Sequence, residues 1–458
     1  MRVRAMVAAA FASVLAVGMA ISGASAAFAD STEVTVGDYP HGVVVSPDGS
    51  RVYAVAAVPG GQPGRLIAVD TATDSVVGEA AVGVEPFGVT VSADGATIYV
   101  ANINSSSISV IDAATLTVTA TWPVAGGPFG ITVDPTGSTV YTSLRNANSV
   151  AAVDATTGAV VTVFPTGGLP AGVALDSAAG LLYVAESGGS TVRRIDLAAG
   201  TSTALATFAG ASPYFLELSP TGDEVWVSPY IGGDIAVIDT ATFTVSSLIP
   251  VPGNARGIVF TDDGRAYVNL SDQSSVAVID RSSNTVLGTT PVGNGPEALA
   301  LAPDGLHAWS ANLFGGSISL VGPAIVTGAA DTTVVEGSQA TFTATARATV
   351  DAVRWQSSTD NGTTWTDVPG ATAVTLTIQA TLADNGTLFR LVATSDLFGD
   401  EVVSEPATLT VSALPPTTTA SGLAATGTDA GPALLLAVLG IAAGALALLG
   451  RRRGQVKS

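Results

Sequence analysis

The chain has 458 residues, of which 12% are charged, and it contains no cysteine, which excludes disulfide and thiol chemistry. One of its 37 acidic and six of its 17 basic residues lie outside residues 30–426, which leaves 36 acidic and 11 basic residues and a formal charge of −25 there. A surface with this charge repels nucleic acid and anionic lipid, so neither is an expected partner.

The first 29 residues predict a secretory signal peptide. Arg2 and Arg4 precede an unbroken apolar run, and small residues follow it up to Ala-Phe-Ala at Ala29, with Ala-Ser-Ala at Ala26 as an alternative cleavage site. The competing interpretation is a membrane anchor that stays on the protein. We expect an extracellular chain that begins near residue 30.

Internal repeats dominate residues 30–322. The motif Pro-x-Gly-apolar-x-apolar recurs from Pro40 to Pro296, and an aspartate recurs in each of six repeats at spacings of 42, 42, 42, 43 and 41 residues. The six aspartates are Asp70, Asp112, Asp154, Asp196, Asp239 and Asp280. We expect each of them to form an Asx-type turn between two strands.

Each repeat contains four short β segments, which in the second repeat are GVTVS, TIYVAN, SISVID and VTATWPV. Four strands in about 42 residues are typical of a propeller blade, and a solenoid is the alternative. The seventh repeat ends after SISLVG, whereas the segment from Thr32 to Val36 is an isolated fourth strand. Inserting this strand into the seventh blade would close the ring and remove both open edges. The pattern therefore predicts a seven-bladed β-propeller.

The repeats resemble the YVTN family of β-propeller repeats, which is related to lactonase-type propellers. The resemblance rests on YVAN at residues 99–102, SVID at 109–112 and IAVIDTAT at 235–242. It covers about residues 32–322. It implies the propeller fold and a place among microbial surface proteins, but no particular ligand or reaction.

Residues 323–412 have alternating β patterns of another kind and resemble bacterial Ig-like domains. Trp355 is the expected core tryptophan, Asn361-Gly362 is a hairpin turn signal, and we interpret Trp365 as a packing residue as well. Residues 413–422 are rich in proline and threonine, which predicts a short extended linker.

The C-terminal residues 423–458 predict an anchor. Residues 433–450 are apolar and would span about 27 Å as a transmembrane helix, and Arg451, Arg452, Arg453 and Lys457 follow them. The preceding Leu423-Ala424-Ala425-Thr426-Gly427 resembles a sortase sorting signal of the LAxTG type, a variant of LPxTG. The resemblance implies cleavage after Thr426 and its transfer to peptidoglycan, following transient membrane insertion. Ala424 replaces the commoner proline and leaves the sortase class open.

One position of the repeat varies in a way that suggests a site. The residue between proline and glycine precedes the innermost strand of each blade, so we expect these seven ring residues to surround one mouth of the central channel. They are His41, Phe87, Phe129, Ala171, Tyr214, Arg256 and Glu297. A constant scaffold with one varied ring favours ligand binding, and packing of the channel mouth is the equal alternative.

Glu217 is the second unusual residue, because the equivalent positions of the other six repeats carry small or β-branched side chains. The simplest explanation is a salt bridge to an arginine such as Arg256. The alternative is that His41, Glu217 and Glu297 together hold a divalent cation or act in acid–base catalysis. We assign no catalytic residue, no metal ligand and no cofactor. The turn aspartates Asp48, Asp94, Asp263 and Asp304 are expected to stabilise turns.

Together these patterns predict an all-β protein with a seven-bladed propeller, an Ig-like β-sandwich and a C-terminal transmembrane helix. The leading functional hypothesis is a cell-wall-anchored surface protein that binds a glycan or protein without catalysis, with the Ig-like domain as stalk. The first alternative is a wall-tethered lactonase-, lyase- or hydrolase-like enzyme that uses the channel mouth. The second alternative is a structural coat protein.

Overall fold

The computed structural model describes residues 32–206, 212–230 and 233–414, which form two β domains. The predicted signal peptide and the predicted sorting signal, with its span at 433–450, lie outside the described residues. Within the described part of the chain, no helix is long and apolar enough to cross a membrane.

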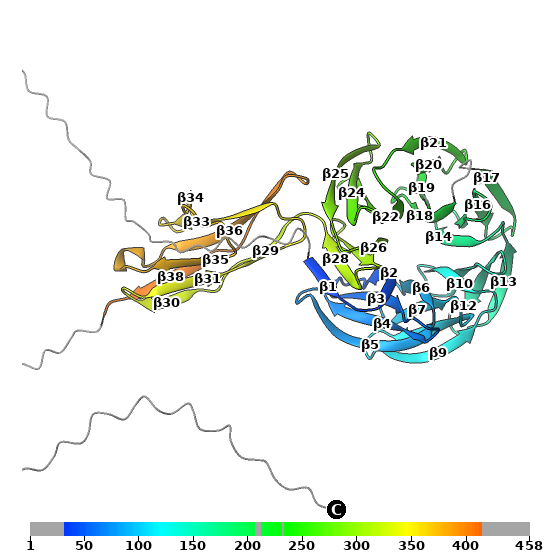
Figure 1. The fold of residues 1–458 in the computed structure, drawn as a ribbon, viewed down its shortest axis with the longest axis horizontal. Coiled ribbons are helices and arrows are strands. Elements are labelled where there is room, and N and C mark those ends of the chain that lie inside the picture. Colours follow the sequence, from blue (N-terminus) through cyan, green and yellow to red (C-terminus); the bar gives the residue numbers. More distant parts are fainter. Residues whose placement is uncertain (1–31, 207–211, 231–232, 415–458) are drawn as a thin grey trace, which may run out of the picture. The chain divides into compact units, whose positions relative to one another are not determined.

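Seven four-stranded antiparallel sheets lie radially around a common centre, as blades of a propeller (Figure 1). The first blade contains β2 (Tyr39–Val45), β3 (Arg51–Ala57), β4 (Pro63–Asp70) and β5 (Ser75–Val84). The second contains β6 (Pro86–Val91), β7 (Thr97–Asn102), β8 (Ser107–Asp112) and β9 (Thr117–Pro123). The third contains β10 (Pro128–Val133), β11 (Thr139–Leu144), β12 (Ser149–Asp154) and β13 (Val160–Pro165).

The next three blades repeat this order from the centre outwards. The fourth contains β14 (Pro170–Asp176), β15 (Leu181–Glu186), β16 (Thr191–Asp196) and β17 (Ser202–Ala206). The fifth contains β18 (Pro213–Leu218), β19 (Glu224–Pro229), β20 (Ile235–Asp239) and β21 (Thr244–Ile249). The sixth contains β22 (Ala255–Phe260), β23 (Arg265–Leu270), β24 (Ser275–Asp280) and β25 (Thr285–Pro291).

The seventh blade joins the two ends of the repeat region. It contains β26 (Pro296–Leu301), β27 (Ala308–Asn312), β28 (Ser317–Val321) and, as its outer strand, β1 (Thr32–Thr35). β1 pairs antiparallel with β28, from Thr32 opposite Leu320 to Thr35 opposite Ser317. The predicted ring closure by an N-terminal strand is therefore confirmed.

Burial along the strands explains why the blades stack. The middle strands β7 and β8 are buried along almost their whole length, because both faces of a blade contact neighbouring blades. The outer strand β9 instead alternates exposed and less exposed residues. The hydrophobic clusters accordingly contain residues of adjacent blades, such as Val100 of the second blade with Val55 of the first.

The glycine of the Pro-x-Gly motif permits close contact between the innermost strands. A Cβ atom added to Gly42 would lie closer than 3.0 Å to the backbone oxygen of Phe87, the ring residue of the next blade. The same conflict, with the next ring residue each time, arises at Gly88, Gly130, Gly172 and Gly257. Glycine is required at these positions because a neighbouring backbone occupies the space of a side chain.

The recurring aspartates form the predicted turns. The Oδ1 atom of Asp70 accepts hydrogen bonds from the backbone N–H groups of Ala72 (3.1 Å) and Thr73 (2.9 Å). Equivalent bonds form at the other five aspartates. The residue four positions after each aspartate has a positive φ, for example Asp74 at 52° and Gly158 at 72°.

The second domain begins at β29 (Ile325–Thr327). Its largest sheet has the order β30 (Thr332–Val335), β38 (Ala407–Ser412), β36 (Leu388–Ser395), β33 (Ala352–Ser358) and β34 (Thr366–Asp367), with β37 (Asp400–Val403) on β36. Two smaller sheets pair β31 (Gln339–Thr343) with β35 (Thr375–Gln379) and β29 with β32 (Thr345–Arg347). One short 3₁₀ helix, η1 (Leu382–Asp384), precedes β36.

Trp355 is fully buried in the core of this domain, as expected, and its indole N–H donates to the carbonyl of Ala373 at 2.8 Å. Arg390 covers the ring of Trp365 at 4.1 Å, which agrees with a packing role for that tryptophan. Asn361 and Gly362 have φ values of 57° and 83°, so the predicted tight hairpin turn is present.

Side chains of the second domain also contact the propeller, with which it forms one compact unit. Arg347 forms an ion pair with Asp74 at 2.8 Å in the turn before β5. Phe398 packs against Tyr267 and lies 5.5 Å from the guanidinium carbon of Arg265. The two domains are therefore joined by packing and charge as well as by the chain.

Closure of the ring predicts a sharp difference between two neighbouring residues of β1. Val34→Asp places an unpaired charge among buried side chains, and we expect it to lower the free energy of unfolding by about 3 kcal/mol or more. Thr35→Asp adds the same charge on the exposed side of the strand and should change stability by less than about 0.5 kcal/mol. Urea unfolding of residues 30–426 measures both, and equal effects would contradict the closure.

Candidate functional site

The ring residues gather at one end of the central channel. Each lies at the beginning of an innermost strand, and we call the propeller face on which these strands begin the mouth face. Phe87, Phe129, Ala171 and Tyr214 form one buried hydrophobic cluster there. These four ring residues therefore pack on each other.

A stack of four side chains crosses the channel mouth. The rings of His41 and Phe87 are 5.0 Å apart, those of Phe87 and Phe129 are 3.7 Å apart, and the guanidinium of Arg145 lies 4.8 Å from the Phe129 ring. Tyr214 meets Phe129 edge-on at 5.7 Å. Both faces of Phe129 are thus covered, which closes the mouth with aromatic side chains.

His41 is neutral at the end of this stack. Burial lowers the pKa of its imidazole to about 4, because the charged form would lose its hydration. Its Nδ1 atom has no hydrogen-bond partner among the described residues, and its Nε2 atom lies 3.9 Å from Glu85.

The charged ring residues occupy the opposite side of the mouth. The Nε atom of Arg256 pairs with Glu297 at 3.3 Å, and Nη1 donates to the carbonyl oxygens of Pro229 and Tyr230. Burial raises the pKa of Glu297 to about 7, against the opposing effect of Arg256. The two charges form a buried pair between adjacent blades.

Glu217 lies apart from this pair, on β18, at a cavity of about 150 Å³ within the channel. Its carboxyl has no ion pair or hydrogen bond among the described residues, and burial raises its pKa to about 8. The side chain keeps some accessible surface because it faces the cavity. The expected salt bridge between Glu217 and Arg256 is wrong, since Arg256 instead pairs with Glu297.

The structure does not assemble the cation site considered from the sequence. His41 and Glu217 both line the cavity, but Glu297 is held by Arg256. Within the described ranges, no three His, Asp or Glu side chains lie close enough to hold a metal ion. The hypothesis that His41, Glu217 and Glu297 share a divalent cation is therefore wrong.

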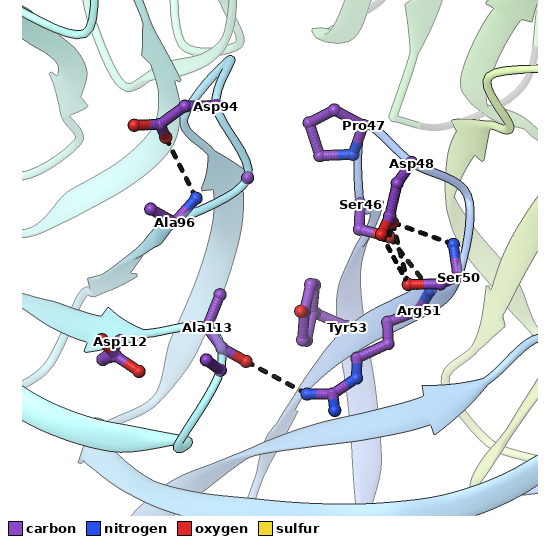
Figure 2. Close-up of a pocket in the computed structure, with 12 residues that line it drawn as sticks. Ser46, Pro47, Asp48, Ser50, Arg51, Tyr53, Asp94, Ala96, Asp112 and Ala113 are labelled. Atoms are coloured by element: carbon purple, nitrogen blue, oxygen red, sulfur yellow. Dashed lines mark hydrogen bonds between the residues drawn. The ribbon is translucent and has the colours of Figure 1, made fainter.

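The opposite face of the propeller carries the turn aspartates, and a hollow of about 620 Å³ lies there between the first two blades (Figure 2). Asp48 accepts hydrogen bonds from Ser46 and Ser50, Asp94 accepts from the backbone of Ala96, and Arg51 donates to the carbonyl of Ala113 (Figure 2). These contacts stabilise turns, as predicted for Asp48 and Asp94.

Asp263 and Asp304 also bond within their own turns. Asp263 accepts from Thr261, and Asp304 accepts from the backbone N–H groups of Leu306 and His307. These carboxylates are already engaged locally, so we do not treat the acidic turns as a site.

The mouth face instead exposes apolar side chains that the sequence analysis missed. We call Tyr39, Leu169, Tyr230 and Phe314 the mouth patch; their exposed fractions are 43%, 43%, 43% and 63%. Tyr39 and Leu169 directly precede prolines of the motif. Tyr230 and Phe314 follow the ends of β19 and β27, and the last residues of these strands pair with the motif prolines of the fifth and seventh blades. Their place beside the motif was a usable signal, because one end of every innermost strand lies on this face.

Comparisons with known proteins agree with this architecture. A family model described as YNCE-like beta-propeller matches residues 18–304, and a domain of unknown function, DUF8696, matches residues 325–413. Endoglucanase C of Cellulomonas fimi is 43% identical over 74 residues, which are 16% of this chain and 6% of that protein. The chain thus spans a small part of that relative.

Two solved structures resemble the propeller. Kuenenia stuttgartiensis hydrazine synthase matches with a TM-score of 0.56 and 23% identity, over 63% of this chain and 97% of that chain. A streptogramin B lyase structure matches with a TM-score of 0.54 and 17% identity, over 63% and 96%. At these identities the likeness shows the fold alone.

The isolated carboxyl of Glu217 predicts a pH-dependent stability. Its pKa is higher in the folded than in the unfolded protein, so its stabilising effect is complete below about pH 4.5 and is lost as the pH rises to about 8. Relative to the wild type, Glu217→Gln should therefore gain about 1.4 kcal/mol of unfolding free energy per pH unit between pH 5 and 8, and nothing more above that.

Urea unfolding at several pH values measures this difference. His41 and Glu297 titrate in both proteins, so their contributions to the pH dependence of the unfolding free energy cancel when the variant is compared with the wild type. Glu405→Gln makes the same chemical change at an exposed glutamate of the second domain and is the control for the substitution itself. Parallel stability curves for Glu217→Gln and the wild type would refute the isolated, protonated carboxyl.

Proposed function

The chain belongs to the YNCE-like β-propeller family, and we propose that it is a cell-wall-anchored surface protein whose propeller binds a ligand without catalysis. The observation that supports binding is the mouth patch, four exposed apolar side chains around a channel mouth that aromatic rings close. These side chains come from the first, fourth, fifth and seventh blades, so a ligand that spans the channel mouth would contact them from several sides.

The chemistry of the mouth face suggests the kind of ligand. Tyr39 and Tyr230 offer aromatic faces and hydroxyl groups, which suit the apolar faces and hydroxyls of a sugar or the side chains of a protein. The ring residues His41, Phe87, Phe129, Tyr214, Arg256 and Glu297 would form the floor beneath this ligand. The acidic balance of residues 30–426 disfavours anionic ligands.

The anchoring part of the proposal rests on the sequence. A signal peptide at residues 1–29 would export the chain, and a sortase would join Thr426 of the LAATG signal to peptidoglycan after the span at 433–450 is inserted. The second domain would act as an Ig-like spacer between propeller and wall. Its contacts with the propeller would orient the mouth face rather than leave it on a loose tether.

A wall-tethered enzyme is the second candidate, and one observation favours it. Glu217 has a pKa of about 8 inside the channel, and a carboxyl with a pKa near neutrality is suited to general acid–base catalysis. No second catalytic group adjoins it among the described residues apart from the neutral His41. Turnover of a substrate that Glu217→Gln abolishes would support this candidate over the first.

The binding experiment uses soluble residues 30–426 on panels of glycans and surface proteins. The double variant Tyr39→Ser and Phe314→Ser removes two exposed contacts, so we expect at least a tenfold loss of affinity with less than about 0.5 kcal/mol change in stability. Surface plasmon resonance measures the affinity. Phe129→Ala is unsuitable, because emptying the buried stack would cost about 3–5 kcal/mol of stability.

The matched control is Val161→Ser with Val163→Ser, which removes two exposed apolar side chains from the outer strand β13. This control should bind as the wild type does. Equal binding by the mouth-patch variant and the wild type would refute the mouth face as the site. No ligand, together with self-association of residues 30–426, would instead support a structural coat protein.

Anchoring has its own test in the native host. Thr426→Ala removes the residue at which the sortase would form its acyl bond, so the protein should leave the peptidoglycan fraction and remain with the membrane. Mutanolysin release followed by immunoblotting measures this distribution. Wild-type protein in the membrane fraction alone, or an unchanged wall fraction in the variant, would contradict sortase anchoring.

A further inference from the structure

The cavity beneath the aromatic stack contains one carboxyl, that of Glu217, which has no hydrogen-bond or ion-pair partner among the described residues. Its walls are glycine backbone and apolar side chains such as Val43, Ile131 and Phe215, and the polar side chains that line it are His41 and Glu217. A buried carboxyl without a hydrogen bond is costly, and a ligand that provides a donor removes this cost. The cavity therefore selects for a mainly apolar ligand with one strong donor.

Divalent metal ions do not fit these walls. Calcium needs six to eight oxygen ligands and magnesium a near-ideal octahedron, whereas the lining side chains supply a single carboxyl. A divalent ion would also leave a net positive charge in an apolar space. A primary ammonium group brings three donors and one charge, which a single carboxylate balances.

We propose that this cavity binds a small primary alkylamine, held as an ammonium–carboxylate pair by Glu217 and in contact with the apolar walls. The volume of about 150 Å³ is that of a cavity that admits benzene, so the amine has about six heavy atoms or fewer. The proposal is independent of surface binding at the mouth patch and of anchoring.

The proton balance of binding follows from the two groups. Free in solution at neutral pH the amine is an ammonium ion, with a pKa of about 10.4 as for lysine, and Glu217 is protonated. Binding pairs the ammonium with the carboxylate, so the proton of Glu217 is released to solvent. No covalent bond forms, and the complex adds no net charge to the cavity.

The guanidinium of Arg145 lies over the ring of Tyr214 on β18 at 5.5 Å, and its buried Nη1 has no hydrogen-bond partner among the described residues. The charged groups on the neighbouring strands are engaged. Those on the strands packed against β18 are Asp176, Glu186, Glu224 and Arg256, and they bond to Ala179, Arg193, Trp226 and Glu297. Across the cavity His41 is neutral, so it does not repel a cation at neutral pH. Glu297, whose pKa burial raises to about 7, is held by Arg256 and does not line the cavity, so Glu217 is the carboxyl that would pair with the ligand.

Isothermal titration calorimetry of residues 30–426 with n-butylamine tests the proposal, with n-butanol as the neutral probe of equal size. We expect the dissociation constant for butylamine to fall about tenfold per pH unit from pH 6 to 8 and then to level off. Titrations in buffers of different ionisation enthalpy should show release of close to one proton at pH 7. Butanol should bind at least tenfold more weakly at pH 8.

Two variants distinguish the effect of the Glu217 charge from the effect of the cavity volume. Glu217→Gln keeps the shape of the side chain and should abolish both the pH dependence and the preference for the amine. Ala298→Leu fills part of the cavity and should weaken butylamine binding at least tenfold while Glu217 is retained. Glu405→Gln, far along the chain in the second domain, should bind as the wild type does.

Thermal unfolding confirms that each variant is folded before titration. Equal affinities for amine and alcohol, or butylamine binding that survives Glu217→Gln, would overturn the proposal. Absence of butylamine binding to the folded wild type at pH 8 would overturn it as well. None of these results would affect the glycan and protein binding measured at the mouth patch.

Discussion

The close approach of neighbouring innermost strands determines the centre of this propeller. The backbone oxygen of one ring residue lies where a Cβ atom of the preceding blade would be, so glycine is required there at Gly42, Gly88 and Gly130. This contact draws the ring side chains onto a small circle. Large residues on such a circle must stack, and the column from His41 through Phe87 and Phe129 to Arg145 is the result. The closed mouth thus follows from backbone packing as much as from the aromatic residues themselves.

The cavity in the channel is lined by the motif glycines of the first four blades and by the two blades that depart from this rule. Phe215 and Ala298 replace the motif glycine in the fifth and seventh blades, and both line the cavity that contains Glu217. Glu217 follows Phe215 on the same short strand, β18. The irregular fifth blade therefore supplies both an altered strand contact and the unpaired carboxyl. The regular blades thus provide the scaffold, whereas the irregular fifth blade provides the unpaired carboxyl in the channel.

The repeat spacing was sufficient to predict the blades, the closing strand and the aspartate turns, because each depends on local pattern and topology. The pairing of Arg256 was predicted wrongly, although the sequence contained a signal for the right partner. Arg256 and Glu297 occupy the same position of adjacent repeats, whereas Glu217 lies three positions further along its strand, or about 10 Å. Arg145 was missed because it follows β11, outside the repeated motif, and only the folded blade brings it to Phe129. Contacts between blades depend on side-chain positions that a single repeat does not reveal.

The two buried carboxyls of the channel differ in what the fold needs from them. Glu297 has Arg256 as a partner, and the pair contributes contacts between blades. Glu217 has no such partner, and the equivalent positions are filled by Val44, Thr90, Thr132, Ala174, Val259 and Ala300. Six blades therefore fold with uncharged residues at this position, so the architecture does not require a carboxyl there. Because an unpaired buried carboxyl destabilises the protein when it ionises, its presence is better explained by a ligand than by packing.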